Sequence, residues 1–138
     1  MKKIISLFLV IILSFTLCAC KNAGKGSVEV NSAAAQSATE LGEGETSFVF
    51  VVADADGNQK VFNISTNKTI VGDALKEHNL ISGDEGDFGL YVKTVNGKTY
   101  DYDKDGKYWA FYIDGEYASS GVDKTTINPQ STYMFKAE

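Results

Sequence analysis

The sequence predicts an α+β fold in which a single helix covers a small mixed or antiparallel sheet. Runs of β-branched and aromatic residues alternate with turn residues over the last two thirds of the 138-residue chain. In only one segment do the apolar residues recur at the spacing of a helix. The aromatic strand 108–113 ends at Asp114-Gly115, a dipeptide typical of tight hairpins. A chain of this length accommodates one such domain with one core.

The first hairpin is predicted from two neighbouring runs. Residues 47–53 are β-branched and aromatic on both faces, as in a buried strand. Residues 60–65 alternate, with Phe62 and Ile64 on one face, and the Asp- and Gly-containing segment 54–58 forms the turn.

The helix is predicted from four residues at the spacing i, i+3, i+4 and i+7, which are Val71, Ala74, Leu75 and His78. Asn67 or Thr69 is expected to cap its start. Leu80 and Ile81 are expected to pack on the sheet, and residues 82–87 to form a loop.

The remaining strands are predicted from alternation and turn signals. Residues 88–95 and 98–103 pair around the Asn96-Gly97 turn, a second turn at 103–106 leads into the strand 108–113, and residues 132–137 close the sheet. A hairpin, one helix and further strands indicate a β-grasp-like arrangement, in which the first and last strands lie side by side in the centre.

The N-terminus has the features of a bacterial lipoprotein signal. Lys2 and Lys3 precede a mostly apolar run too short for a membrane span, which ends in Leu17-Cys18-Ala19-Cys20. This lipobox predicts a signal peptide at 1–19 and lipid on Cys20, which anchors the protein to the extracytoplasmic face of the cell membrane. An ordinary secretory signal is the alternative.

A flexible tether is predicted for residues 20–46, which include the lipidated Cys20 and are rich in Ala, Ser, Gly and Glu. A short helix at 33–41 is the alternative. The folded domain is then 47–138. Its acidic character, with a formal net charge of −5 for the chain, does not favour nucleic acid.

The sequence does not predict an enzyme. Cys18 leaves with the signal and Cys20 carries lipid, so no free thiol remains, and His78 is the only histidine. The turn with Asp101, Asp103 and Asp105 resembles the first half of a calcium loop, but Tyr112 stands where that loop has its glutamate. A plain hairpin turn is favoured over a cation site, and neither a cofactor nor a metal is expected.

The aromatic segment 108–121 is open to two interpretations. In the first, it is a core strand, central and covered on both sides, followed by a loop. In the second, Trp109 and its neighbours present the small-residue loop 118–121 to a flat ligand. The seven tyrosines of the chain, all beyond residue 90, suit a partly solvated binding surface or the solvated face of a sheet.

The segment from Tyr108 onward resembles the C-terminal domain of the transcobalamin and intrinsic factor family, which a bacterial family of unassigned function shares. The matching residues are Tyr108-Trp109, Asp114-Gly115, Gly121-Val122-Asp123, Ile127 and Tyr133-Met134-Phe135, and the segment 71–75 fits that family's single helix. In the animal proteins this domain closes over one side of cobalamin, and a separate helical domain covers the other side. The ligand-facing positions that the resemblance implies here are Trp109, Tyr117, Ala118, Ser119, Ser120, Gly121 and Val122.

The function expected from these features is that of a membrane-anchored binding lipoprotein without enzymatic activity. It would capture a small molecule outside the cell, a corrinoid such as cobalamin being the leading candidate, and pass it to a membrane transporter. The alternative is a surface protein–protein interaction or adhesion module, in which an exposed sheet edge pairs with a partner protein.

Overall fold

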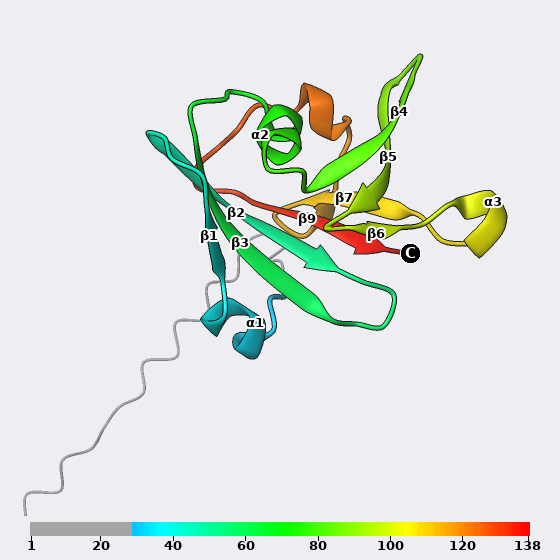
Figure 1. Ribbon diagram of the computed structural model, residues 1–138, viewed down its shortest axis with the longest axis horizontal. Coiled ribbons are helices and arrows are strands. Elements are labelled where there is room, and N and C mark those ends of the chain that lie inside the picture. Colours follow the sequence, from blue (N-terminus) through cyan, green and yellow to red (C-terminus); the bar gives the residue numbers. More distant parts are fainter. Residues whose placement is uncertain (1–28) are drawn as a thin grey trace, which may run out of the picture.

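The computed structural model of the chain describes residues 29–138, whose strands form two sheets. The elements are, in chain order, α1 (Ser32–Gln36), β1 (Thr39–Leu41), β2 (Thr46–Ala53), β3 (Gln59–Thr66), α2 (Val71–Glu77), β4 (Ile81–Gly86), β5 (Gly89–Val95), β6 (Lys98–Thr99), α3 (Tyr102–Asp105), β7 (Trp109–Ile113), β8 (Glu116–Tyr117), the 3₁₀ turn η1 (Val122–Lys124) and β9 (Thr132–Ala137). The six-stranded sheet has the order β1-β3-β2-β9-β7-β8, and the three-stranded sheet has the order β4-β5-β6 (Figure 1).

The predicted first hairpin and the central strand pair are both confirmed. β2 pairs antiparallel with β3, and it pairs parallel with β9, so that Phe50 lies opposite Phe62 on one side and Tyr133 on the other. Two sheets with few and short helices fit the predicted α+β class broadly, although most of the regular structure is strand. The expectation of a single sheet is wrong, because β4, β5 and β6 pair only with one another in the described chain. The closer β-grasp assignment stays a prediction.

The main core lies between the six-stranded sheet and a second layer made by α2 and the three-stranded sheet (Figure 1). Phe50, Leu75, Val95 and Tyr133 are among its fully buried side chains. The Tyr133 hydroxyl accepts a hydrogen bond from the backbone N–H of Asn128 at 2.8 Å, so this ring is buried without losing its polar contact.

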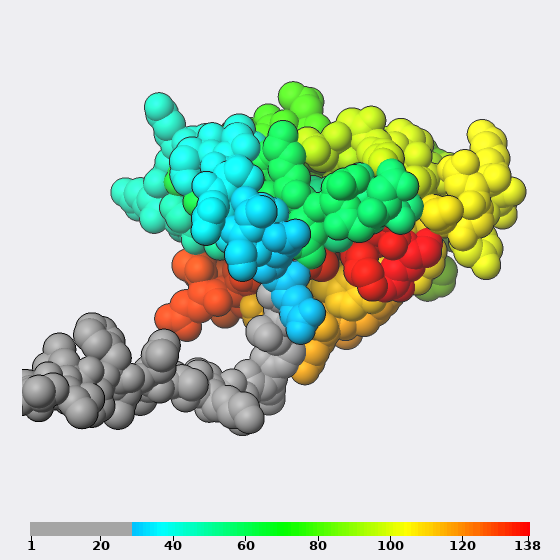
Figure 2. All heavy atoms as spheres, turned by 90° about the horizontal axis from the view of Figure 1, so that it is seen from below, coloured from blue at the N-terminus to red at the C-terminus, as the bar shows by residue number. Residues whose placement is uncertain are grey.

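The opposite face of the six-stranded sheet is covered by the start of the described chain. Val30, Ala34 and Ala38 pack against a smaller cluster formed by Val51 and Met134 with their neighbours. β1 adds a parallel strand beside β3, and in Figure 2 the blue α1 segment lies against this face. The expectation of a flexible tether is therefore wrong for residues 30–41, because these small apolar side chains find a sheet face to cover.

Helix α2 confirms the predicted helix, but its start differs from the prediction. Its N-cap is Ile70, which makes no side-chain cap. Asn67 instead accepts a hydrogen bond from the Glu45 backbone through its side chain, and the Thr69 carbonyl accepts one from Ile127. The start of α2 is thus held by tertiary backbone bonds rather than by a local cap.

Two segments predicted as loop or turn have regular structure. Residues 81–86 form β4, which pairs with β5 through a register shift after Ser82. The turn after β6 contains α3, where the Asp101 side chain accepts from the Asp103 N–H and Gly106 ends the helix at φ 62°. This capping role replaces the predicted plain hairpin turn, and it shortens the predicted strand 98–103 to Lys98–Thr99.

Within residues 29–138, no helix has both the length and the hydropathy needed to cross a membrane. The signal peptide predicted at 1–19 and the lipidated Cys20 lie outside the described residues, so both stay predictions.

Candidate functional site

A cavity of about 650 Å³ opens between β5, β7 and the segment that follows β8. We call it the aromatic groove. The structure brings all the predicted ligand-facing residues together along it, namely Trp109, Tyr117, Ala118, Ser119, Ser120, Gly121 and Val122. Their binding of a ligand stays a prediction.

The second wall of the groove was not foreseen from the sequence. It is formed by the turn between β4 and β5 and by the first part of β5, through Phe88, Leu90, Tyr91 and Val92. These residues lie about twenty to thirty positions before the first wall in the chain, and only the packing of the three-stranded sheet beside β7 brings them near. The one local signal was an aromatic residue, Phe88, within a segment of turn residues.

Exposed aromatic side chains gather around this groove. Phe88 is 95% exposed, Tyr117 61% and Tyr91 45%, and all three line it. Tyr102, 60% exposed, lines the adjoining cavity. These four are the exposed large hydrophobic residues of the described chain. Solvated aromatic surface concentrated in one place is typical of a binding site.

The adjoining cavity, of about 590 Å³, shares Tyr91 and Tyr108 with the aromatic groove. Its one lysine, Lys93, forms ion pairs with Asp84 at 2.6 Å and with Asp101 at 3.9 Å. The hydrogen bond to Asp84 raises the pKa of Lys93 above its ordinary value. Because two carboxylates already neutralise this cation, the cavity does not favour an anionic ligand.

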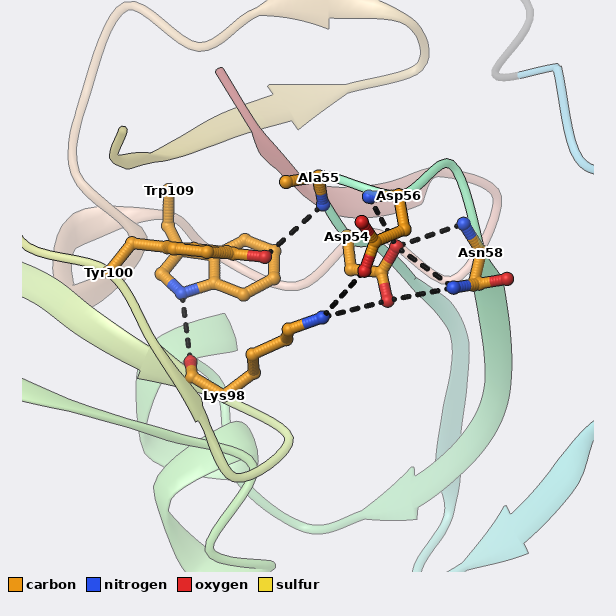
Figure 3. Close-up of polar contacts among 7 residues, drawn as sticks. All are labelled: Asp54, Ala55, Asp56, Asn58, Lys98, Tyr100 and Trp109. Atoms are coloured by element: carbon orange, nitrogen blue, oxygen red, sulfur yellow. Dashed lines mark hydrogen bonds and ion pairs between the residues drawn. The ribbon is translucent and has the colours of Figure 1, made fainter. Parts of the chain in front are cut away.

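Trp109 forms the buried base of the groove rather than an exposed face. Its indole N–H donates to the Lys98 carbonyl at 3.1 Å, and its ring lies 5.0 Å from that of Tyr100, centroid to centroid (Figure 3). The Tyr100 hydroxyl accepts from the Ala55 backbone at 3.2 Å. These contacts join β6 to the β2–β3 turn and fix the indole.

The same close-up shows the acidic turn between β2 and β3. The Asp54 carboxylate accepts from Asn58 and from Lys98, whose Nζ lies 3.2 Å from Asp54 Oδ2 and 3.3 Å from Asp56 Oδ2 (Figure 3). Burial opposes ionisation of Asp54, but the hydrogen bonds from Asn58, Lys98 and Asp56 outweigh it and lower the pKa of Asp54. Through its contacts with Lys98, this turn holds β6 in place and has a structural role.

The aromatic strand has a different place from the one predicted. β7 lies between β9 and the two-residue β8, so it is next to the sheet edge and not central. Trp109 and Phe111 do face the main core, as the alternation predicts. The loop that follows is tied to β7 because the Ala118 N–H donates to the Phe111 carbonyl at 2.9 Å. The core interpretation is therefore confirmed for Trp109 and Phe111, which also form one wall of a cavity, whereas presentation of the loop to a flat ligand stays a prediction.

Two tyrosine hydroxyls converge on the Glu138 carboxylate at the end of β9. Tyr112 donates at 2.5 Å and Tyr108 at 3.5 Å. The hydrogen bond to Glu138, together with burial, raises the pKa of Tyr112 to about 12. The charge of Tyr117 raises the pKa of Tyr108, and the bond from Tyr112 lowers the pKa of Glu138.

We expect the free energy of unfolding to fall between pH 10 and pH 12 because of Tyr112. An unfolded tyrosine loses its proton near pH 10, whereas folded Tyr112 keeps it up to about pH 12. The stabilisation is complete below pH 10 and is lost as pH rises, by at most about 2 kcal/mol given the partial exposure of the ring. Urea unfolding at pH 9 and at pH 11.5 measures this fall in the free energy of unfolding. Tyr112→Phe should show a smaller fall, and an equal fall in both proteins would contradict the assignment.

The described residues offer no ready site for a bare metal ion. Residues 29–138 contain no group of three or more His, Cys, Asp or Glu side chains that could hold one. His78, predicted to be structural or at the surface, is half-buried at the end of α2. Its Nε2 has no hydrogen-bond partner among the described residues, and it packs so closely on Gly42 that a Cβ there would lie 2.6 Å away.

Residues 68–138 match a protein family described as a domain of unknown function, DUF4430. The chain belongs to this family. The match covers the segment from the start of α2 to β9, and it therefore includes both walls of the aromatic groove. No curated protein matches the chain at a significant level.

Several solved structures resemble this DUF4430 protein, and two of them bear on its fold and function. One is a crystal structure from Ruminococcus gnavus, described as that of a candidate metal-binding protein, with 26% identity and a TM-score of 0.64 over 68% of this chain and 97% of that one. The other is haptocorrin in complex with Cbi, with 14% identity and a TM-score of 0.50 over 71% of this chain and 26% of that one. The chain thus spans about a quarter of the haptocorrin length, and this second likeness concerns the fold alone.

Proposed function

We propose that this protein binds a flat organic small molecule in the aromatic groove, with a corrinoid as the leading candidate. The observation that carries the proposal is the gathering of three of the four exposed aromatic residues around one cavity with a small-residue wall. The volume of about 650 Å³ falls within the range of small-molecule sites. Tyrosine supplies flat apolar area with a polar tip, which suits a conjugated ring with polar edges.

The resemblance to haptocorrin and the neighbour described as metal binding both support a corrinoid. A corrinoid brings its own cobalt ion, so its capture requires no set of protein metal donors. The groove is open on one side, as expected for a domain that covers a single face of a large ring. A second protein surface then covers the opposite face.

The cellular role that we propose follows from the N-terminal sequence. The lipobox at residues 17–20 anchors the protein through Cys20 on the extracytoplasmic face of the cell membrane. From there, it delivers its ligand to a membrane transporter and performs no catalysis itself. A surface module for protein–protein interaction or adhesion is the competing function.

Titration of the full chain with cobinamide and with cobalamin, followed by calorimetry, tests the proposal. We expect binding in the micromolar range or tighter, weakened about tenfold by Tyr117→Ala. Tyr117 is 61% exposed, so its truncation removes ligand contact without removing core packing.

Tyr102→Ala is the matched control, because Tyr102 is equally exposed but lines only the adjoining cavity. It should change the affinity less than about threefold. Absence of heat at millimolar corrinoid would reject this ligand class. Crosslinking at the membrane surface would then test the competing interaction module.

A further inference from the structure

The carboxylate of Asp123 lies next to the aromatic groove, behind residues that line it. Asp123 is the middle residue of η1, and its neighbours Val122 and Lys124 line the groove together with Gly121. On the opposite wall it meets Gly89, which stands between the lining residues Phe88 and Leu90. Asp123 therefore occupies the place where the two walls come together.

Three glycines make room for this residue. A Cβ on Gly72 of α2 would lie 2.9 Å from the Asp123 Cα. A Cβ on Gly89 would lie 2.7 Å from Asp123 Oδ2, and one on Gly121 would lie 2.6 Å from Oδ1. The backbone of Asp123 thus packs directly on Gly72, and its carboxylate lies between Gly89 and Gly121. Neither Gly89 nor Gly121 places a side chain over the carboxylate.

The Asp123 carboxylate lacks the hydrogen-bond donors that a buried carboxylate oxygen requires. Oδ1 of Asp123 is buried and makes no hydrogen bond within residues 29–138. Lys124, the adjacent cation, donates instead to the Phe88 carbonyl at 3.5 Å. By contrast, the exposed Asp114 carboxylate accepts hydrogen bonds from Ser131 and from Thr132, both at 2.8 Å. A buried carboxylate oxygen without a donor is costly, which points to a partner supplied from outside residues 29–138.

We propose that Asp123 accepts a hydrogen bond from an N–H group at the edge of the ligand bound in the aromatic groove. This inference rests on the proposed function and specifies its ligand class. The ligand is a flat ring with neutral carboxamide or cationic N–H donors at its rim. A ring that carries carboxylates at the same positions is rejected, because two carboxylates would meet without a proton or a cation between them.

Cobinamide and cobyrinic acid form a matched pair of probes, since they carry carboxamides and carboxylates respectively around one corrin ring. We expect calorimetry with the full chain to give at least tenfold tighter binding of cobinamide. Asp123→Asn should weaken cobinamide binding about tenfold, the effect of losing a charge-assisted hydrogen bond, and should narrow the preference between the two probes.

Asp54→Asn is the control, because it changes the net charge equally at a carboxylate outside the groove. It should leave the preference between the probes unchanged. Thermal melting of the ligand-free proteins adds a second readout. Asp54→Asn should lower Tm through its lost hydrogen bonds, whereas Asp123→Asn should leave Tm equal or higher.

Three results would overturn the inference, and they differ in what they say of the proposed function. If Asp123→Asn binds both probes as the unchanged protein does, the ligand site stands and Asp123 has no part in it. If Asp123→Asn lowers Tm as Asp54→Asn does, the carboxylate has a structural partner. If neither probe binds any of the proteins, the corrinoid proposal fails as well.

Discussion

Replacing Trp109 by alanine is expected to lower the free energy of unfolding by about 3–5 kcal/mol, the range for truncating a buried aromatic side chain. The indole is 5% exposed and packs against Tyr100. Its N–H donates to the Lys98 carbonyl, and this hydrogen bond is lost in the variant. Urea unfolding followed by circular dichroism measures the loss.

Trp109→Phe separates the contribution of ring packing from that of the hydrogen bond to Lys98. It keeps most of the ring in place and removes the hydrogen bond to Lys98, so we expect a loss of about 1–2 kcal/mol. These two variants also decide whether the aromatic strand serves mainly as core or as part of the ligand site. A cost below about 1 kcal/mol for Trp109→Ala, together with weaker corrinoid binding, would place the indole in the ligand site rather than in the core.

The parts of the fold that the sequence predicts well are those where local pattern and turn chemistry agree. The β2–β3 hairpin and α2 each combine a clear period with a turn or a helix start. At the turn after β7, Asp114 has φ 52° and Gly115 φ 84°, and at the turn after β5, Asn96 has φ 48°, the conformations for which these residues are suited.

The parts that the sequence does not predict are held by contacts with distant segments. β4 reads Ile-Ser-Gly-Asp-Glu-Gly, a loop composition, and becomes a strand because β5 offers a partner and Gly83 permits close approach to the Tyr91 backbone. The segment 30–41 has no strong period. Its alanines and valine become ordered because one face of the main sheet is otherwise uncovered.

The candidate site also has one part that the sequence predicts and one part that it does not. The wall formed by residues 117–122 is contiguous in sequence, and resemblance alone points to it. The wall at Phe88–Val92 requires knowledge of how the two sheets pack. The unpartnered carboxylate of Asp123 cannot be recognised without an account of each hydrogen bond, because in sequence it is one acidic residue among eighteen.

Replacing Gly72 by valine is expected to lower the free energy of unfolding by about 3 kcal/mol, the upper part of the range for overpacking a core position. The new Cβ alone would lie 2.9–3.0 Å from backbone atoms of Val122 and Asp123. Backbone cannot rotate away as a side chain can, and the two segments are also joined by the hydrogen bond from the Val71 N–H to the Thr125 carbonyl at 2.9 Å. Valine forms helix slightly better than glycine, by a few tenths of a kcal/mol, so the clash decides the sign.

Asp73→Val is the matched control, since Asp73 is exposed on the same helix and valine and aspartate have similar helix propensity. We expect a change within about 1 kcal/mol, part of it from losing a negative charge in the first turn. Gly72→Val should also weaken cobinamide binding, because η1 carries both Val122 in the groove wall and the carboxylate seated between Gly89 and Gly121. If Gly72→Val unfolds at the same urea concentration as Asp73→Val, η1 moves freely away from α2. The glycine seat would then not hold Asp123 in one position, and the selectivity proposed for its carboxylate would lose its geometric basis.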